Sequence, residues 1–142
     1  MTALAQSYDY DACDTAPLPR ILIVDDSMPT ARGLAALLHG ASYQTAVAFR
    51  GEDALERVRS DGADTFAGAI VDIHLPDISG LLVSQKLREL LGPDVPIIVL
   101  SGDTSMQMLN SLPHVGATYF FSKPVNSGQL LRRIKECVAQ PD

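Results

Sequence analysis

Short apolar runs alternate along the chain with longer segments whose apolar residues recur at helical spacing. The runs ILIV, YQTAVAF, FAGAIV, PIIVL and TYFF begin at Ile21, Tyr43, Phe66, Pro96 and Thr118. Helical patterns follow them at residues 29–39, 51–60, 80–91, 104–112 and 127–138. Strands that alternate with helices in this way predict a parallel sheet covered by helices on both faces.

The apolar pattern also predicts the order of the strands. Four runs are too continuously apolar for half-exposed strands, so we expect them to be buried. The second run alternates through Tyr43, Thr45, Val47 and Phe49, which is typical of a partly exposed edge strand. Placing it outside the first strand gives a flavodoxin-like (βα)5 sandwich with strand order 2-1-3-4-5 and a ligand crevice beside the first and third strands.

Capping and turn residues support these helix boundaries. Ser27 is a suitable N-cap for the first helix, with Pro29 in its first turn, and His39-Gly40 is a suitable C-terminus. Pro113 falls near the end of the fourth helical pattern, where a proline removes a hydrogen bond and clashes with the preceding turn. We therefore expect the fourth helix to be short or bent.

Polar residues follow four of the predicted strands directly. The first strand ends in Asp25-Asp26, the third in Asp72 and the fourth in Ser101, and the fifth runs into Lys123. Each of these alone is compatible with an ordinary role as a capping acid, a turn residue or a solvated side chain. Because the carboxyl ends of parallel strands share one edge of the sheet, we expect all of them to lie together.

Such a group of residues predicts a metal-dependent phosphoryl site. Three carboxylates in one pocket repel each other and need a cation, and oxygen ligands without a His or Cys cluster favour Mg²⁺. With Asp25 and Asp26 neutralised, the Asp72 carboxylate becomes a nucleophile toward phosphorus. Lys123 and the Ser101 hydroxyl would share the charge on the transferred group. The expected product is an aspartyl phosphate at Asp72.

The chain resembles the receiver domains of two-component response regulators over residues 20–139. The resemblance rests on ILIVDDS, on VDIHLPDISG with Gly80 eight positions after Asp72, on LSG and on FFSKPV. It implies Asp72 as phosphoacceptor, and it implies a Mg²⁺ site. The implied ligands are Asp25, Asp26, Asp72 and the backbone carbonyl of His74.

The same resemblance implies a signalling mechanism. A histidine kinase or a histidine phosphotransfer protein donates the phosphoryl group, and the receiver catalyses the transfer and a slow hydrolysis, so that it is not a conventional turnover enzyme. Lys123 pairs with the phosphoryl group, Ser101 moves toward it, and Phe120 is the aromatic rotamer switch. The face formed by the fourth helix, the fifth strand and the fifth helix then repacks for an unknown downstream protein.

Three further positions concern the rates and the partners of this chemistry. His74 and Asp103 lie two residues after Asp72 and Ser101, and receivers tune dephosphorylation at such positions; two solvated loop residues are the alternative. By analogy with the family, Met28 and nearby residues of the first helix are expected to dock the phosphoryl donor.

Composition adds limits to this interpretation. The net charge of −6 and the lack of clustered basic residues argue against direct nucleic-acid binding. Residues 1–19 are expected to form a flexible acidic tail ahead of a receiver domain at residues 20–142. We find no signal peptide or membrane span, so we expect a cytoplasmic protein, and Cys13 and Cys137 form no recognisable disulfide or metal framework.

Other functions remain open. The chain stops soon after the last helix, which suggests a stand-alone receiver, or else a receiver excised from a larger hybrid kinase or regulator. A receiver fold used for protein contacts without phosphorylation is a further alternative. A haloacid-dehalogenase-type phosphatase would want an acid where His74 stands, and a flavodoxin-like FMN carrier would want a Ser/Thr-rich loop in place of Asp25-Asp26.

Overall fold

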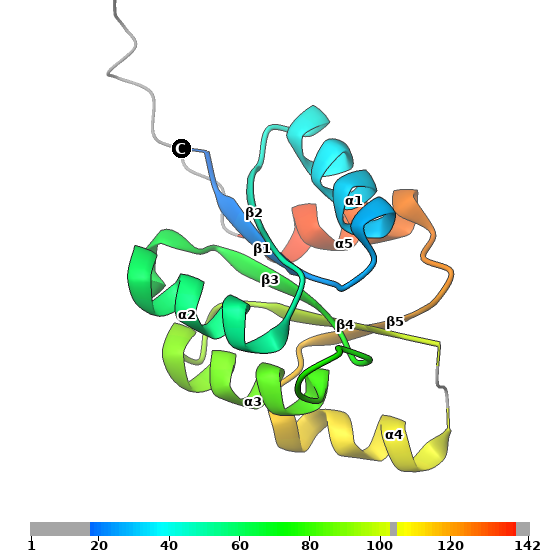
Figure 1. Ribbon diagram of the computed structural model, residues 1–142. Coiled ribbons are helices and arrows are strands. Elements are labelled where there is room, and N and C mark those ends of the chain that lie inside the picture. Colours follow the sequence, from blue (N-terminus) through cyan, green and yellow to red (C-terminus); the bar gives the residue numbers. More distant parts are fainter. Residues whose placement is uncertain (1–17, 103–104, 139–142) are drawn as a thin grey trace, which may run out of the picture.

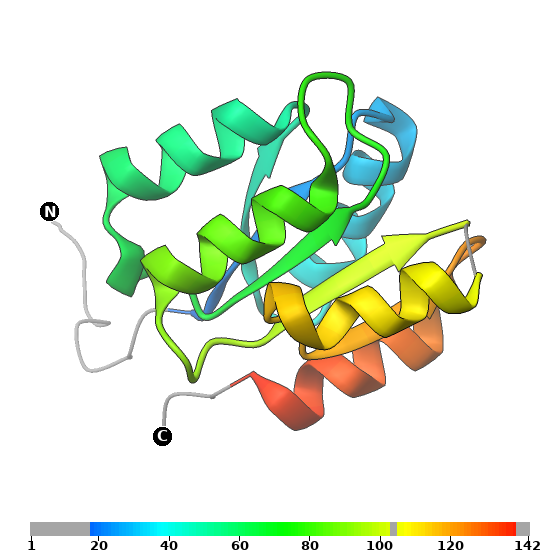
Figure 2. The ribbon, with the colours of Figure 1, turned by 90° about the horizontal axis from the view of Figure 1, so that it is seen from below.

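A parallel sheet with helices on both faces forms the body of the protein (Figures 1 and 2). The computed structural model describes residues 18–102 and 105–138. Its strands are β1 (Arg20–Val24), β2 (Gln44–Ala48), β3 (Gly68–Asp72), β4 (Ile97–Ser101) and β5 (Tyr119–Ser122). They pair in the order β2-β1-β3-β4-β5, all parallel, which confirms the predicted order.

Helices lie on both faces of this sheet. They are α1 (Met28–Gly40), α2 (Gly51–Asp61), α3 (Gly80–Leu91), α4 (Met106–Ser111) and α5 (Ser127–Cys137), with 3₁₀ turns η2 (Ala63–Thr65) and η3 (Leu112–Val115). Helices α1 and α5 lie on one face and α2 and α3 on the other, while α4 lies beyond α3 toward β5 (Figure 1). The helices predicted from the sequence are therefore present.

The core consists of two apolar layers, one on each face of the sheet. In β1, Leu22 and Val24 pack toward α2 and α3, whereas Ile21 and Ile23 pack toward α1 and α5. This alternation follows from the two-residue period of a strand. All four side chains are buried, and burying each contributes about 1.5–3 kcal/mol, so that β1 is a rigid support for the acids that follow it.

The two edge strands test the burial predictions. At one edge, Thr45 and Val47 of β2 are only half-buried, as the alternating pattern predicts. At the other edge, the expectation that β5 is fully buried is wrong, because Tyr119, Phe120 and Phe121 are all half-buried. β5 has β4 as its neighbour on one side and none on the other, so these large rings keep part of their surface exposed.

The capping predictions agree with the helix ends. The Ser27 hydroxyl accepts the Thr30 N–H at 3.4 Å, and α1 ends at Gly40. Helix α4 has six residues and passes at Leu112 into η3, which contains Pro113, so the predicted shortening is confirmed. The acidic tail expected at residues 1–19 lies outside the described residues except for Leu18 and Pro19.

Within the described ranges, no helix is both long enough and apolar enough to span a lipid bilayer.

Candidate functional site

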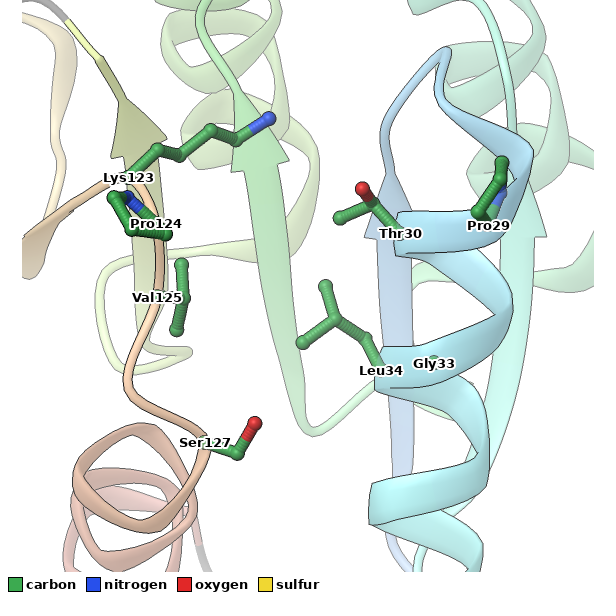
Figure 3. Close-up of a pocket in the computed structure, with 8 residues that line it drawn as sticks. All are labelled: Pro29, Thr30, Gly33, Leu34, Lys123, Pro124, Val125 and Ser127. Carbon is green, nitrogen blue, oxygen red and sulfur yellow. The ribbon is translucent and has the colours of Figure 1, made fainter.

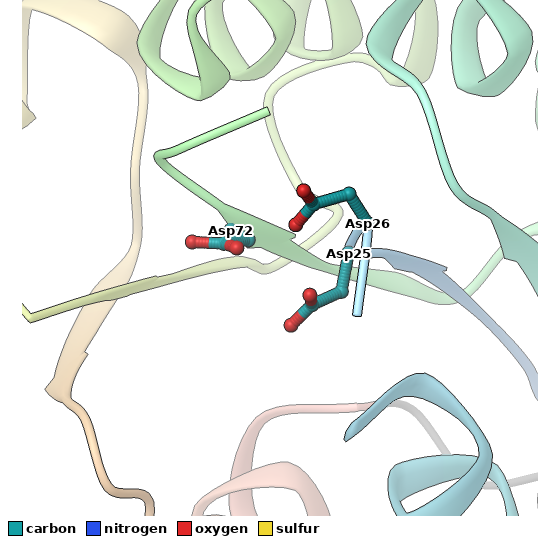
Figure 4. Close-up of side chains that lie close together, drawn as sticks. All are labelled: Asp25, Asp26 and Asp72. Carbon is teal, nitrogen blue, oxygen red and sulfur yellow. The ribbon is translucent and has the colours of Figure 1, made fainter. Parts of the chain in front are cut away.

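Three carboxylates meet at the carboxyl ends of β1 and β3 (Figure 4). Asp25 and Asp26 follow β1 directly, and Asp72 is the last residue of β3. One oxygen from each lies within 4.8 Å of the others. The predicted cluster of Asp25, Asp26 and Asp72 is thus brought together by the pairing of β1 with β3.

Two of these carboxylates are removed from water. Asp25 is 1% exposed and Asp72 is 4% exposed, whereas Asp26 is exposed. Each buried acid accepts a backbone N–H on Oδ1: Ser27 donates to Asp25 at 2.9 Å, and His74 donates to Asp72 at 3.2 Å. These bonds orient the two carboxylates and offset part of the cost of burying their charge.

Lys123 joins the two buried acids. Its Nζ lies 3.3 Å from Oδ2 of Asp25 and 3.2 Å from Oδ2 of Asp72. Partial burial acts to lower the pKa of Lys123, but the hydrogen bond and charge of Asp72, followed by those of Asp25, outweigh it and raise the pKa above 10.5. The ammonium group therefore stays charged at neutral pH.

The charges and donor types of the cluster fit a divalent cation. In the described part of the chain, the cluster has three carboxylates and one ammonium group, that of Lys123, which forms ion pairs with two of them, so two negative charges remain. The candidate ligand atoms are all oxygens, which suits Mg²⁺. Asp25, Asp26 and Asp72 are the side chains that could hold the ion.

Gly80 closes the loop that follows Asp72. Its N–H donates to the Ile73 carbonyl at 2.8 Å. A Cβ at Gly80 would lie 2.6 Å from Ile73 Cα and closer still to the Asp72 carbonyl oxygen. Only glycine fits this close approach, which gives a physical reason for the glycine eight positions after Asp72.

The structure places the remaining predicted residues as follows. Ser101 is the last residue of β4 and is fully buried, and its carbonyl accepts the Lys123 N–H at 2.9 Å. Phe120 packs partly into the core layer of α2 and α3, while Phe121 packs into the opposite layer. The side chain of His74 is exposed, and Asp103 lies outside the described residues.

A pocket of about 300 Å³ lies beside the acidic cluster, between α1 and the segment after β5 (Figure 3). Leu34 and Thr30 line it from α1, and Pro124 and Val125 line it from the other side. Lys123 reaches inward from the end of β5 and joins the pocket to the cluster.

One contact near the site was not predicted from the sequence. Asp77, in the loop between β3 and α3, accepts the N–H groups of Gly51 and Glu52 at the start of α2. The only sequence signal is indirect: the residue before α2 is Arg50, whose side chain makes no capping hydrogen bond.

Together, the sheet order and the lysine-bridged acidic cluster define a flavodoxin-like α/β domain whose carboxylates, at the carboxyl ends of β1 and β3, suit a divalent cation. The family model "Response regulator receiver domain" matches residues 21–135, and the chain belongs to this family. Receiver domains take phosphoryl groups from histidine kinases and generally bind Mg²⁺ at such a cluster of aspartates.

Individual relatives agree with this assignment. The transcriptional regulatory protein DltR of Streptococcus agalactiae is 35% identical over 117 residues, which cover 82% of this chain and 50% of that protein. The response regulator MprA of Mycobacterium ulcerans is 33% identical over 116 residues, covering 82% and 48%. The chain thus spans about half the length of these curated relatives.

Solved structures support the fold. A CheY-like receiver domain protein from Methanospirillum hungatei JF-1 is 31% identical, with a TM-score of 0.77 and coverage of 84% of this chain and 92% of that one. The chemotaxis protein CheY4 of Vibrio cholerae is 26% identical, with a TM-score of 0.77 and coverage of 85% and 99%.

Proposed function

We propose that this chain is the phosphoacceptor receiver of a two-component phosphorelay and that Asp72 takes the phosphoryl group. The observation that carries the proposal is the bridge from Lys123 to both buried acids, Asp25 and Asp72. One acid is enough for a purely structural ion pair. Lys123 instead pairs with two acids, and these lie beside a third carboxylate, that of Asp26. The donor is a histidine kinase or a histidine phosphotransfer protein.

In the transfer, a carboxylate oxygen of Asp72 forms a bond to phosphorus. The bond between phosphorus and the imidazole nitrogen of the donor breaks, and its electron pair leaves with the imidazole, which takes up a proton. Asp25, Asp26, Asp72 and the His74 backbone carbonyl would hold Mg²⁺, which would supply positive charge to stabilise the phosphoryl oxygens. The Lys123 ammonium exchanges its contact with Asp72 for one with a phosphoryl oxygen.

The signal is proposed to travel through Ser101 and Phe120. A dianionic group at Asp72 attracts the Ser101 hydroxyl from the end of the neighbouring strand β4. The space that this movement vacates admits the half-buried ring of Phe120, and the face formed by α4, β5 and α5 repacks for a downstream protein. Phosphorylation shifts the equilibrium between the resting and the repacked conformation only by the difference between its interaction free energies with the two. This difference is on the order of a few kcal/mol.

The donor is proposed to dock over α1. Met28, at the start of that helix, is 45% exposed although it is apolar. The pocket between α1 and the segment after β5 opens beside it and is joined to the site by Lys123 (Figure 3). A donor seated there would bring its phosphohistidine to the edge of the sheet that carries Asp72.

The test is incubation of the chain with Mg²⁺ and a small acyl phosphate, followed by mass spectrometry. Wild type is expected to gain one phosphoryl group, and Asp72→Asn none. A matched control is Asp61→Asn, which removes an acid at the far end of α2, where it pairs with Arg20 and Arg57. Label on Asp72→Asn equal to that on wild type, or no label on wild type, would overturn the proposal and favour a receiver fold that acts without phosphorylation.

A further inference from the structure

The loop after the phosphoacceptor is attached to the neighbouring helix by one carboxylate. Asp77 accepts the Gly51 N–H on Oδ1 at 2.8 Å and the Glu52 N–H on Oδ2 at 2.9 Å. The first N–H groups of a helix have no partner within the helix, and Arg50, the residue before α2, supplies none through its side chain. Asp77 is therefore the cap of α2, supplied from a distant part of the chain.

The electrostatics of this carboxylate agree with a strong cap. The hydrogen bond from Glu52 N–H is the main reason that the pKa of Asp77 falls to about 2, and the bond from Gly51 adds to it. The positive end of the α2 dipole favours the same charged form. Asp77 thus stays ionised throughout the physiological pH range.

Packing tightens the same junction. A Cβ at Gly51 would lie 2.6 Å from Ile78 Cγ1 and 2.6 Å from Val83 Cγ2, so the backbone of α2 touches the loop directly. Ile78 follows Asp77 in the chain, and one short stretch therefore makes both the polar and the apolar contact with α2.

The other end of the loop is fixed to the acceptor. The His74 N–H donates to Asp72 Oδ1 at 3.2 Å, and the Gly80 N–H donates to the Ile73 carbonyl at 2.8 Å. The loop of residues 73–79 is thus held by hydrogen bonds at Asp72 and at Asp77, and only a few residues lie between these two points. A displacement at Asp77 would move the His74 amide that orients the Asp72 carboxylate.

We propose that Asp77 is a positioning residue of the phosphoacceptor site: by capping α2 it holds the loop of residues 73–79 so that Asp72 and the His74 carbonyl stay in place for Mg²⁺. This inference rests on the proposed function of Asp72. It assigns Asp77 no contact with the phosphoryl group. Its effect is on the affinity of the site for Mg²⁺ and on the rate at which Asp72 is phosphorylated.

The test compares Asp77→Ala and Asp77→Asn with Asp61→Asn. Asp61 also has a lowered pKa, owing first to the hydrogen bond from the Arg57 side chain and next to that from Arg20, but it belongs to α2 itself and lies at the end of the helix opposite to the one that Asp77 caps. Mg²⁺ affinity is measured by calorimetry without any phosphoryl donor, the urea midpoint gives the stability, and acyl phosphate labelling gives the rate.

We expect Asp77→Ala to weaken Mg²⁺ binding about three- to tenfold, below the 10- to 100-fold typical for groups that directly hydrogen-bond a metal ligand. Asp77→Asn keeps one acceptor oxygen and should lie between Asp77→Ala and wild type. Asp61→Asn should lower the urea midpoint but leave Mg²⁺ affinity within about twofold of wild type.

The outcomes separate this inference from the proposed function. If wild type binds Mg²⁺ and is labelled, and both Asp77 variants do so equally well, Asp77 is only a structural cap and the inference is overturned alone. If wild type neither binds Mg²⁺ nor accepts the label, the proposed function fails and the inference falls with it. Weaker Mg²⁺ binding in the Asp77 variants but not in Asp61→Asn supports the inference.

Discussion

Nζ of Lys123 lies 3.2 Å from Oδ2 of Asp72, across the sheet from the end of β5 to the end of β3. We predict that Lys123→Ala lowers the rate of phosphorylation about a hundredfold, because it removes a donor aimed at the oxygens on which charge develops. Label should still be confined to Asp72. The measurement is the initial rate with acyl phosphate, and Lys86→Ala, an exposed lysine of α3, is the matched control.

The same ion pairs give stability a pH dependence at the alkaline end. The folded-state pKa of Lys123 is raised above 10.5, so its contribution is fully present below pH 10.5 and is lost as pH rises through the higher folded value. The stability difference between wild type and Lys123→Ala should therefore shrink above pH 10.5. A difference that stays constant from pH 8 to the alkaline limit of folding would contradict the assigned ion pairs.

The acidic cluster should make the metal-free protein less stable than it would be with one acid fewer. We predict that Asp26→Asn raises the free energy of unfolding without Mg²⁺, because it relieves repulsion from the buried carboxylates of Asp25 and Asp72. Wild type should gain about 2.7 kcal/mol from Mg²⁺ at a hundred times its dissociation constant, and the variant much less at the same concentration.

Urea unfolding with and without Mg²⁺ measures both effects, and Asp64→Asn, an exposed acid of η2, is the control. If Mg²⁺ stabilises wild type and Asp26→Asn equally, Asp26 is not a Mg²⁺ ligand.

Gly80 should tolerate no side chain. We predict that Gly80→Ala lowers the free energy of unfolding by about 1–3 kcal/mol, because the added methyl group collides with the backbone of Asp72 and Ile73. The collision should also displace Asp72, the proposed acceptor, so the phosphorylation rate should fall as well. Gly40→Ala is the control, since a Cβ there meets nothing within 4 Å. Equal free energies of unfolding for the two variants would show that the loop accommodates the methyl group without loss of stability.

The sequence predicts the strand order and the cluster well, because both follow from local patterns. The continuous apolarity of β1 and β3 marks central strands, and the position of Asp72 directly after an apolar run marks the edge that carries the site. The same reasoning fails for the burial of β5: the predicted order already places it at an edge, but the apolar run that contains Phe120 and Phe121 is typical of a buried strand, although both rings are half-buried.

The hydrogen bonds between Asp77 and the start of α2 could not be predicted in the same way. Asp77 and Gly51 are brought together by the pairing of distant elements, and no local spacing relates them. The spacing of Gly80 from Asp72 is visible in the sequence, but the reason for it, a backbone contact without room for a methyl group, appears only in three dimensions.

His74 should control how long the phosphoryl group persists. Its side chain is exposed, and its backbone N–H donates to the Asp72 carboxylate at 3.2 Å. We predict that His74→Ala, and equally Asp103→Ala, changes the rate of dephosphorylation more than the rate of phosphorylation. Decay is followed after removal of the acyl phosphate, at fixed Mg²⁺. Unchanged decay in both variants would mean that the two residues are solvated loop positions without a role in hydrolysis.

Phe120 and Phe121 provide a matched pair for testing the switch, because adjacent strand residues face opposite sides of the sheet. Phe120 packs partly into the layer of α2 and α3, and Phe121 into the layer of α1 and α5. Both rings are half-buried, so truncating either to Leu should lower stability by a similar amount, about 1 kcal/mol.

We predict that only Phe120→Leu weakens the response of α4 to phosphorylation. The response is measured as amide shifts of residues 106–111 by NMR, with Mg²⁺ and acyl phosphate present and the extent of labelling matched. Ser101→Ala should be labelled at Asp72 and yet show the same loss of response, because it removes the hydroxyl that the phosphoryl group attracts. If Phe121→Leu weakens the response as much as Phe120→Leu does, the signal does not depend on the rotamer of Phe120, and repacking of the whole β5 edge would be its source.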